Sequence, residues 1–362
     1  MAGNTFGEIF RVTTFGESHG QGVGVVIDGC PSRIALAPED FDAAMARRRP
    51  GMGPYDTPRK EPDRVKILSG VYEGLTTGAP LALFIENRDA NSRPYEILGS
   101  LFRPGHADFT YFKKYDHYDY RGGGRYSARE TAARVAAGVV AGKILGSEEV
   151  RVSAYTLEMG GVRADRVDPE FAETNLFYCA DPGVFEAMKE VLSKAAKEGD
   201  SLGGVVEVRV KGAPAGLGEP VFDKLDADLA KAVMSVGAVK GVEIGAGFEA
   251  ARLRGSENND PITPEGFRTN RAGGILGGIS NGDDIVLRVA VKPIPSIYLE
   301  QETVDRQGKA ARIKMTGRFD VSAIPRINPV LEAMVKIVLA DHVLRSRAVG
   351  AELPMPLQGK KE

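Results

Sequence analysis

Residues 10–29 read FRVTTFGESHGQGVGVVIDG. The β-branched and aromatic runs at 8–15 and 22–28 predict two strands, because such residues favour extended structure. Between them lies a loop bounded by glycines, which allow a backbone to come close to a ligand. This loop carries Ser18 and His19. The stretch therefore predicts a strand, a glycine-flanked functional loop and a second strand.

Residues 16–20, GESHG, also fit the G-x-S-x-G pattern, so a serine hydrolase with Ser18 as nucleophile is the alternative function. A nucleophile elbow needs a helix directly after the serine. Residues 21–27 instead contain glycines and β-branched side chains, which disfavour a helix. The loop interpretation is therefore preferred.

The composition limits the class of protein. The 362 residues are 43% hydrophobic and 27% charged, the balance of a globular enzyme. A net charge of −2 gives no general attraction to nucleic acid or anionic membranes, so an anion site must use local arginines. Cys30 and Cys179 lack metal-ligand spacing and predict reduced thiols in a cytoplasmic protein without a metal site. No apolar run reaches the roughly 18 residues of a membrane helix, and no signal-peptide pattern opens the chain.

Hydrophobic patterns and turn residues predict the secondary structure. The expected strands cover 8–15, 22–28, 64–69, 81–86, 150–158, 204–211, 242–253 and 284–291. The expected helices cover 38–48, 127–145, 183–198, 223–235 and 325–347. Because these elements mix without a regular βαβ rhythm, they predict a layered α+β architecture. The last residues, 351–362, are expected to form a polar tail.

The segment 87–126 shows little secondary-structure signal over forty residues. Connections of that length tend to be binding loops or lids. It contains RPGHAD at 103–108 and ends in RGGGR at 121–125. We therefore expect this segment to contribute to a binding site.

The helix predicted after these glycines is a candidate anion site. Ser127 and Glu130 have the spacing of a capping box. The small residues of 132–140 predict a closely packed, buried helix whose free N–H groups face the glycines. Positive charge would come from Arg125, Arg129 and Arg134. A phosphate or carboxylate ligand is favoured over the simpler interpretation, a capped core helix after a flexible turn.

Other basic residues allow two interpretations each. The arginines at 47–49 end a predicted helix, where solvated cations complement the dipole. We assign that role to two of them and a ligand role to one.

The histidines also differ in their expected roles. His19 and His106 lie beside glycines in loops, which favours proton transfer, whereas His342 lies in a helical pattern and is expected to be structural.

Several motifs together resemble the chorismate synthase family. They are GESHGQGVG at 16–24, RPGHAD at 103–108, GGGRYSARETAARVAAG at 122–138, GGILGGISNG at 273–282, and Arg318 and Asp320 before a helix entry. The resemblance covers nearly the whole chain, and the combination is specific although no single motif is. It implies one catalytic domain over 1–350, folded as a β-α-β sandwich of mostly antiparallel sheets and assembled as a homotetramer.

By this resemblance the chain is a lyase that converts 5-enolpyruvylshikimate 3-phosphate to chorismate and phosphate, the last step of the shikimate pathway of aromatic amino acid biosynthesis. The reaction is an anti 1,4-elimination that needs reduced FMN without net redox change. Both ligands are anionic, and local arginines would meet that need. Fused fungal-type members reduce their flavin with NADPH. No such domain is visible here, so we expect an external reductant.

The resemblance also implies roles for individual residues. His19 would protonate the departing phosphate, helped by Ser18 and Ser127. His106 would stabilise the reduced flavin near N1, and Asp320 would assist at N5. The substrate anions would be held by Arg48, Arg103, Arg134 and Arg318. Contacts to FMN would come from Arg125, Tyr126, Ser127, Gly237, Ala238, Gly278, Arg318, Lys292, Pro293, Ile294, Pro295 and Ser296.

The chain departs from the common family pattern at several of these positions. It has RYS at 125–127 for R-S-S, KPIPS at 292–296 for K-P-T-S-S, Gly237 for an asparagine, RFDVS at 318–322 for R-H-D-P-C, and Pro54 for an arginine. Both loop histidines and Asp320 are retained. The departures bear on individual contacts to FMN and on the substrate role near residue 54.

Overall fold

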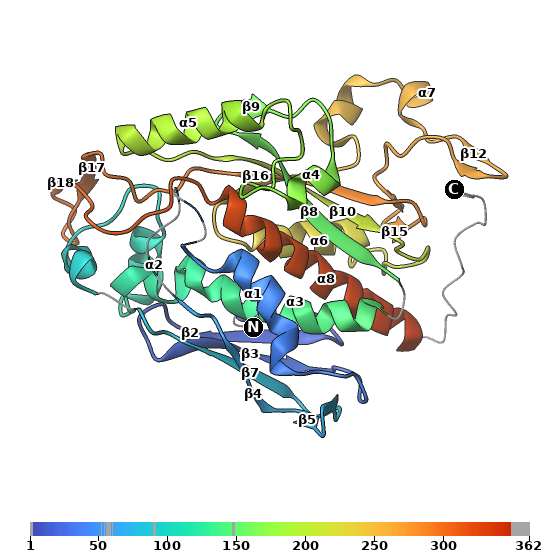
Figure 1. Ribbon diagram of the computed structural model, residues 1–362, viewed down its shortest axis with the longest axis horizontal. Coiled ribbons are helices and arrows are strands. Elements are labelled where there is room, and N and C mark those ends of the chain that lie inside the picture. The colour runs from blue at the N-terminus through green and yellow to red at the C-terminus, as the bar shows by residue number, and fades with distance from the viewer. Residues whose placement is uncertain are drawn as a thin grey trace.

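Two five-stranded antiparallel sheets enclose a layer of helices in the computed structural model (Figure 1). The structure describes residues 3–51, 53, 55, 59, 61–89, 92–146 and 149–348. This architecture confirms the predicted α+β class and the β-α-β sandwich with mostly antiparallel sheets. The predicted tail over 351–362, the domain boundary at 350 and Pro54 lie outside the described residues.

The first sheet has the strand order β1-β2-β3-β7-β4. Its strands are β1 (Thr5–Phe6), β2 (Arg11–Gly16), β3 (Gly22–Asp28), β7 (Leu81–Glu86) and β4 (Val65–Ser69). In β3, alternate side chains turn inward, and Val23, Val25 and Ile27 are each 0% exposed. The β2–β3 pair is antiparallel, with Gly16 opposite Val23, so the quoted stretch forms a hairpin at the sheet centre.

The second sheet has the order β11-β16-β10-β8-β9. Its strands are β11 (Val239–Ile244), β16 (Ile285–Val291), β10 (Gly204–Lys211), β8 (Arg151–Met159) and β9 (Val162–Arg163). Four small hairpins are β5 (Val71–Tyr72) with β6 (Leu75–Thr76), β12 (Ile262–Thr263) with β13 (Gly266–Phe267), β14 (Ile275–Leu276) with β15 (Ile279–Ser280), and β17 (Gln301–Val304) with β18 (Ala310–Ile313).

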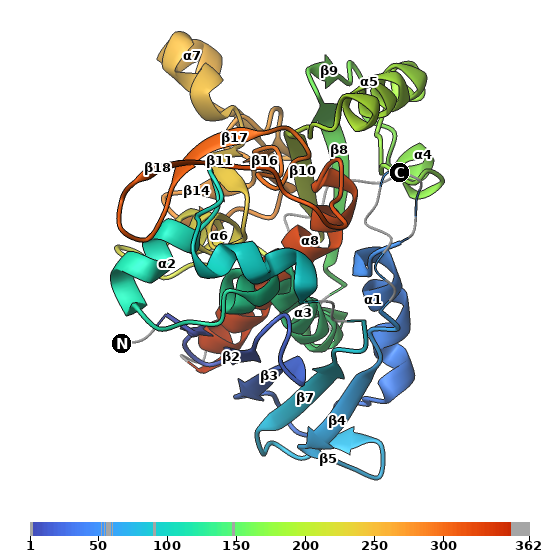
Figure 2. The same ribbon diagram turned by 90° about the vertical axis from the view of Figure 1, so that its left-hand side faces the viewer.

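The layer between the sheets is built on two helices, α3 (Thr131–Gly146) and α8 (Ile324–Ala348), flanked by α1 (Asp42–Arg48) and α6 (Leu225–Met234) (Figures 1 and 2). The outer helices are α2 (Asp108–Tyr115), α4 (Pro169–Glu173), α5 (Phe185–Glu198) and α7 (Gly255–Asn258). Short 3-10 helices are η1 (Pro38–Phe41), η2 (Arg93–Gly99), η3 (Arg121–Tyr126), η4 (Ala128–Glu130) and η5 (Gly247–Arg252).

The small residues of α3 let it lie very close to α8. A Cβ added to Gly138 would stand 2.4 Å from the Cβ of Ala333, so any larger residue would push the two helices apart. Most of α3 is buried, which confirms the predicted close packing. Among the described residues, no helix is both long and apolar enough to cross a membrane.

Two predicted elements are wrong. The strand expected over 242–253 ends at Ile244, and residues 247–252 form η5. Gly245 and Gly247 take left-handed backbone conformations, with φ of 59° and 55°, which break the extended chain. The segment 87–126 is not without structure, because it contains η2, α2 and η3.

Candidate active site

The loop between β2 and β3 holds Ser18 and His19 in place. Ser18 is 1% exposed, and its backbone N–H donates to the carbonyl of Gly124 at 3.1 Å. The His19 ring lies edge-on to Tyr95, with ring centroids 5.2 Å apart. A strand, not a helix, follows the loop, so the hydrolase elbow is absent here, as the sequence indicated.

The triple-glycine loop lies between the two histidines of the predicted site. Gly122, Gly123 and Gly124 all have positive φ, which side chains disfavour. A Cβ on Gly122 would stand 2.0 Å from Cε1 of His19, and one on Gly123 would stand 3.5 Å from Cε1 of His106. The missing side chains therefore leave room for His19 on one side and let the backbone approach His106 on the other.

The predicted capping box at the start of the helix is only half right. The Ser127 hydroxyl accepts from the Arg129 N–H at 3.3 Å, as an N-cap should. Glu130 does not return to the cap. Its carboxylate accepts from the Thr14 hydroxyl at 3.0 Å and from Arg134 at 2.9 Å, since a buried carboxylate gains more from these partners.

Arg125 and Arg134 both contact this polar group. Arg125 donates to the carbonyl and the hydroxyl of Thr14, at 2.8 and 2.6 Å, and lies 3.7 Å from Glu130. Besides its bond to Glu130, Arg134 donates to the Ser235 hydroxyl at 2.5 Å. Both cations thus border the start of α3, where the sequence predicted positive charge.

A buried network surrounds His106. The Asp108 carboxylate is 0% exposed and accepts from Nε and Nη2 of Arg103 at 2.8 Å each, and from the Tyr126 hydroxyl at 2.7 Å. Burial alone would raise the pKa of Asp108, but the hydrogen bonds and charge of Arg103, together with the nearby His106 ring, outweigh burial and hold that pKa well below its ordinary value. Burial raises the pKa of Tyr126, which keeps its hydroxyl a donor.

The protonation state of His106 follows from its neighbours. Its Nδ1 accepts from the Ala107 N–H at 2.9 Å and lies 3.2 Å from Nη2 of Arg103. A guanidinium can only donate, so both of these neighbours are donors to Nδ1. Burial lowers the pKa of His106, so the neutral ring is favoured. Oδ1 of Asp108 lies 3.5 Å from Nδ1, farther than the two donors. We therefore assign the proton of the neutral ring to Nε2, which can then donate to a ligand.

The segment 292–296, for which the resemblance implied contacts to FMN, lies against this network. The Lys292 ammonium donates to the carbonyl of Gly105 at 2.5 Å, and the Ser296 hydroxyl accepts from Arg103 at 3.3 Å. The Lys292 N–H also donates to the carbonyl of Ala238 at 2.9 Å, which brings 237–238 to the same place. Burial lowers the pKa of Lys292.

Gly278 lies away from these residues within the chain. Its carbonyl accepts from the N–H of Leu225, the first residue of α6. The ten residues of α6, about 15 Å of helix, separate it from Gly237. The chain therefore brings 125–127, 237–238 and 292–296 together, but not Gly278, and Arg318 is paired with Asp89.

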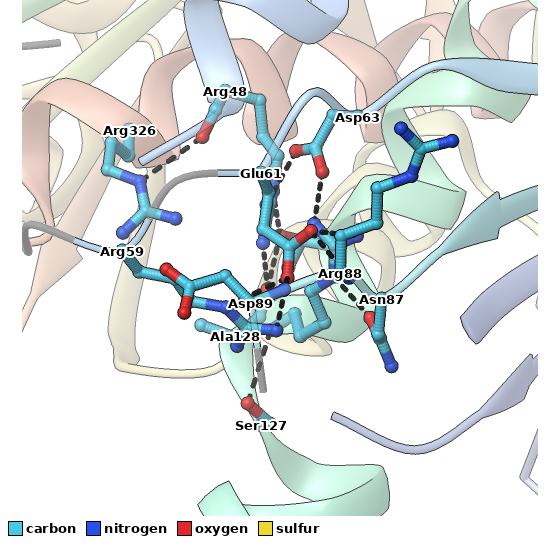
Figure 3. Close-up of polar contacts among 12 residues, drawn as sticks. Arg48, Arg59, Glu61, Asp63, Asn87, Arg88, Asp89, Ser127, Ala128 and Arg326 are labelled. Carbon is cyan, nitrogen blue, oxygen red and sulfur yellow. Dashed lines mark hydrogen bonds and ion pairs between the residues drawn. The ribbon is translucent and has the colours of Figure 1, made fainter. Parts of the chain in front are cut away.

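Four predicted substrate arginines and Asp320 all have protein partners. Arg103 and Arg134 are described above. Arg48 is 2% exposed and pairs with Asp63, and burial lowers its pKa to about 9 (Figure 3). Arg318 makes two hydrogen bonds to Asp89, at 2.8 and 3.0 Å, which raise its pKa. Asp320 pairs with Arg326 at 2.6 Å.

The arginines at 47–49 do not form the solvated helix end that was predicted for two of them. Arg47 makes two hydrogen bonds to Glu332, at 2.7 and 2.8 Å, and its guanidinium lies over the Tyr178 ring. Glu332 is 5% exposed. The prediction fails because α1 ends against α8, not in solvent.

Sequence reasoning missed the residues that connect these arginines. Asp63 is buried and ion-pairs with both Arg48 and Arg129. Glu61 accepts from Arg59 at 2.6 Å and from the backbone N–H of Arg88 at 3.0 Å (Figure 3). The positive backbone φ of 50° at Asp63 leaves no signal in the sequence. Apart from their charge, nothing in the sequence marked Glu61 and Asp63 as partners of these arginines.

Other features of the described residues lie outside this group. A cavity of about 840 Å³ on the second sheet is lined by charged residues such as Glu207, Arg209 and Arg288, and includes none of the predicted site residues. In the described ranges no cluster of His, Cys, Asp or Glu is arranged to hold a metal ion. Both cysteines are free thiols, as predicted, and both are buried.

Comparison with known proteins identifies the family. A family profile described as chorismate synthase matches residues 10–344. The chain is 61% identical to a chorismate synthase of Desulfosudis oleivorans over 96% of this chain and 99% of that protein. It is 58% identical to one of Nitratidesulfovibrio vulgaris over 98% of this chain and 100% of that protein. A crystal structure of chorismate synthase matches with a TM-score of 0.75 and 34% identity over 94% of this chain and 93% of that one. None of these relatives supports a serine hydrolase.

Proposed function

The chain belongs to the chorismate synthase family of lyases, which acts in the shikimate pathway, and from this premise we propose how its own residues perform the elimination with reduced FMN. The observation that carries the proposal is the triple-glycine loop between His19 and His106. It supports one site in which a proton donor and a cofactor-binding histidine lie on either side of the same backbone.

His19 gives a proton to the departing phosphate, and Ser18 and Ser127 assist it. Loss of phosphate breaks a carbon–oxygen bond and leaves negative charge on oxygen, which a positioned acid neutralises. Support comes from the location of Ser18 and Ser127, which both lie against the glycine loop. Histidine titrates close to neutral pH, which suits this role.

The residues around His106 fit a reduced flavin. When bound, reduced FMN supplies electron density that helps a poorly acidic hydrogen to leave. A reduced flavin ring carries negative charge near N1, and the Nε2–H of His106 is a donor for it. Lys292 would supply further positive charge, and the absence of side chains at 122–124 would let the backbone come close to the cofactor. Arg125, Tyr126, Ser127, Gly237, Ala238 and 292–296 would hold the cofactor, with Gly278 as a more distant contact and Asp320 near N5.

The substrate anions bind to arginines that are paired with carboxylates in the free chain. Arg318 is half-buried and held by Asp89, so a substrate carboxylate or phosphate would compete with Asp89 for it. Arg48 and Arg103 are too buried to reach a ligand without rearrangement, so they act first by fixing Asp63 and Asp108. Arg134 borders the start of α3, where anions are favoured.

We also infer a cytoplasmic homotetramer whose flavin is reduced by an external reductant, whether or not NADPH is the ultimate source. These three points rest on the family resemblance. The free thiols of Cys30 and Cys179 fit a reducing compartment. Light scattering of the purified protein measures the assembly state.

Anaerobic turnover tests the function directly. Purified protein with 5-enolpyruvylshikimate 3-phosphate is expected to form chorismate and phosphate in equal amounts when FMN has been photoreduced. With oxidised FMN and no reductant it is expected to form neither. Turnover in air with oxidised FMN alone would contradict the proposal.

Gly122→Ala tests the packing between the glycine loop and His19. The new methyl group would overlap the His19 ring, so the ring must move, and a misplacement of about 1 Å can cost on the order of 10²-fold in kcat. The left-handed backbone also costs about 1–2 kcal/mol of stability. Measurement of kcat and Tm separates the two effects.

Gly74→Ala is the matched control. Gly74 has φ of 76° and no heavy atom within 4 Å of its added Cβ, so it carries the backbone penalty without the clash. We expect a similar loss of Tm and normal kcat. Equal activity losses in the two variants would mean that the contact with His19 is irrelevant to turnover.

A further inference from the structure

Asn87 is the first residue after β7, and its side chain reaches the loop that carries His19. Its amide nitrogen donates to the carbonyls of Glu17 and Gly20, both at 2.9 Å. These two carbonyls lie on either side of Ser18 and His19 in the sequence. One side chain therefore holds both ends of the loop.

The orientation of this amide is fixed by chemistry. Its Oδ1 accepts from Nε of Arg129 at 2.8 Å, and a guanidinium only donates, so the nitrogen must face the two carbonyls. Arg129 is itself 4% exposed and ion-pairs with Asp63. The Asn87 backbone N–H also donates to the carbonyl of Gln21 at 3.1 Å. Asn87 is thus held in place on its backbone and at both ends of its amide.

We propose that Asn87 is a positioning residue that fixes the loop 17–20, so that the His19 ring lies against Gly122. The inference rests on the proposed function, in which His19 is the proton donor. Asparagine suits the position because one short side chain must donate twice and accept once. Aspartate has nearly the same shape but offers no donor, so its second oxygen would face two carbonyl oxygens.

Asn87→Asp is the test, because it keeps the shape and the contact with Arg129 while it removes both donors and adds a negative charge beside that guanidinium. We expect kcat to fall about 10- to 100-fold, since an acid displaced by about 1 Å loses much of its effect. The KM for the substrate should change less than threefold, because the substrate arginines keep their partners. In the flavin-free protein, the NMR signals of the His19 ring, assigned with His19→Ala, should shift, whereas those of His342 should not.

Asn175→Asp is the matched control. The Asn175 amide also donates to two backbone carbonyls, those of Phe171 and Cys179, at 2.9 and 3.1 Å, but no predicted site residue is among its partners. The Tm of the Asn175→Asp variant should fall at least as much as that of Asn87→Asp. Its kcat should be normal, and its His19 NMR signals should not move.

The outcomes separate the inference from the proposed function. Unchanged His19 signals in Asn87→Asp would overturn the inference, even if Tm falls. Shifted signals with normal kcat would also overturn it, because the loop position would then be irrelevant to turnover. If the wild-type protein shows no turnover with reduced FMN, the proposed function fails, while the NMR comparison still decides whether Asn87 fixes the loop.

Discussion

His19→Ala and His106→Ala are each expected to lower kcat about 10²- to 10⁴-fold, the usual effect of removing a positioned acid or base. The fold should persist, because both histidines lie in loops: the His19 ring contacts Tyr95 and Gly122, and the His106 ring lies beside the Ala107 N–H. Single-turnover kinetics with reduced FMN measure the loss, and circular dichroism checks the fold.

The two variants should differ in what else they change. His106→Ala should also weaken binding of reduced FMN, because its Nε2–H is the proposed donor to the flavin, whereas His19→Ala should leave FMN affinity unchanged. His342→Ala is a poor control, since that ring is 1% exposed and bonded to Asp228, so its loss would destabilise the core. His117 is exposed and is not among the predicted site residues, so His117→Ala is the better control and should retain full kcat. An unchanged kcat in either loop variant would return that histidine to a structural role.

The strands and long helices were predictable because their signals are local. The strand at 22–28 and that at 81–86 have the predicted bounds, since alternating buried residues end at turn residues. The helix α8 lies within one residue of its predicted bounds for the same reason. The loop with Ser18 and His19 followed directly from the strands on either side of it.

The helix α2 was missed because its stability comes from distant contacts. It has eight residues, and Ala107 at its start offers no side chain to cap it. Its Phe109 and Phe112 pack on Phe102, and Tyr111 packs on Tyr126. Short helices depend on such packing more than on propensity, so the pattern alone looked like a loop.

Polar partners were missed because they lie far apart in the sequence. Arg129 meets Asn87 and Asp63, which precede it by 42 and 66 positions. Asparagine and aspartate are common in turns, so neither residue stands out when the chain is read alone. The sequence thus indicated which arginines were unusual, but not that Arg48, Arg103 and Arg318 are each paired with a carboxylate.

Asp108→Ala is expected to cost about 3–5 kcal/mol of unfolding free energy, because it leaves the buried charge of Arg103 without its partner. The Tyr126 hydroxyl loses its acceptor as well. Denaturant unfolding at pH 7 measures the loss. Glu186→Ala, which breaks an exposed pair with Lys189, is the control and should have little effect. A loss below about 1 kcal/mol for Asp108→Ala would mean that the pair is not buried in solution.

The pH dependence of this loss has a definite sign. The folded pKa of Asp108 lies below its unfolded value, so the carboxylate contributes its full stability above about pH 3.9, its ordinary pKa. That contribution decreases as the pH falls from there toward the folded pKa. The difference between wild type and Asp108→Ala should therefore be constant from pH 5 to 7 and narrow below about pH 4.

A double variant separates stability from function at the same site. Arg103→Met with Asp108→Leu replaces the buried pair by apolar residues of similar volume, which is often neutral or stabilising. It should recover much of the stability that Asp108→Ala loses. It should not recover turnover, because His106 would lose the guanidinium beside its Nδ1 and the Tyr126 hydroxyl would lose its acceptor. Recovery of both would mean that the pair serves the fold alone, and that His106 needs no partner to hold its ring.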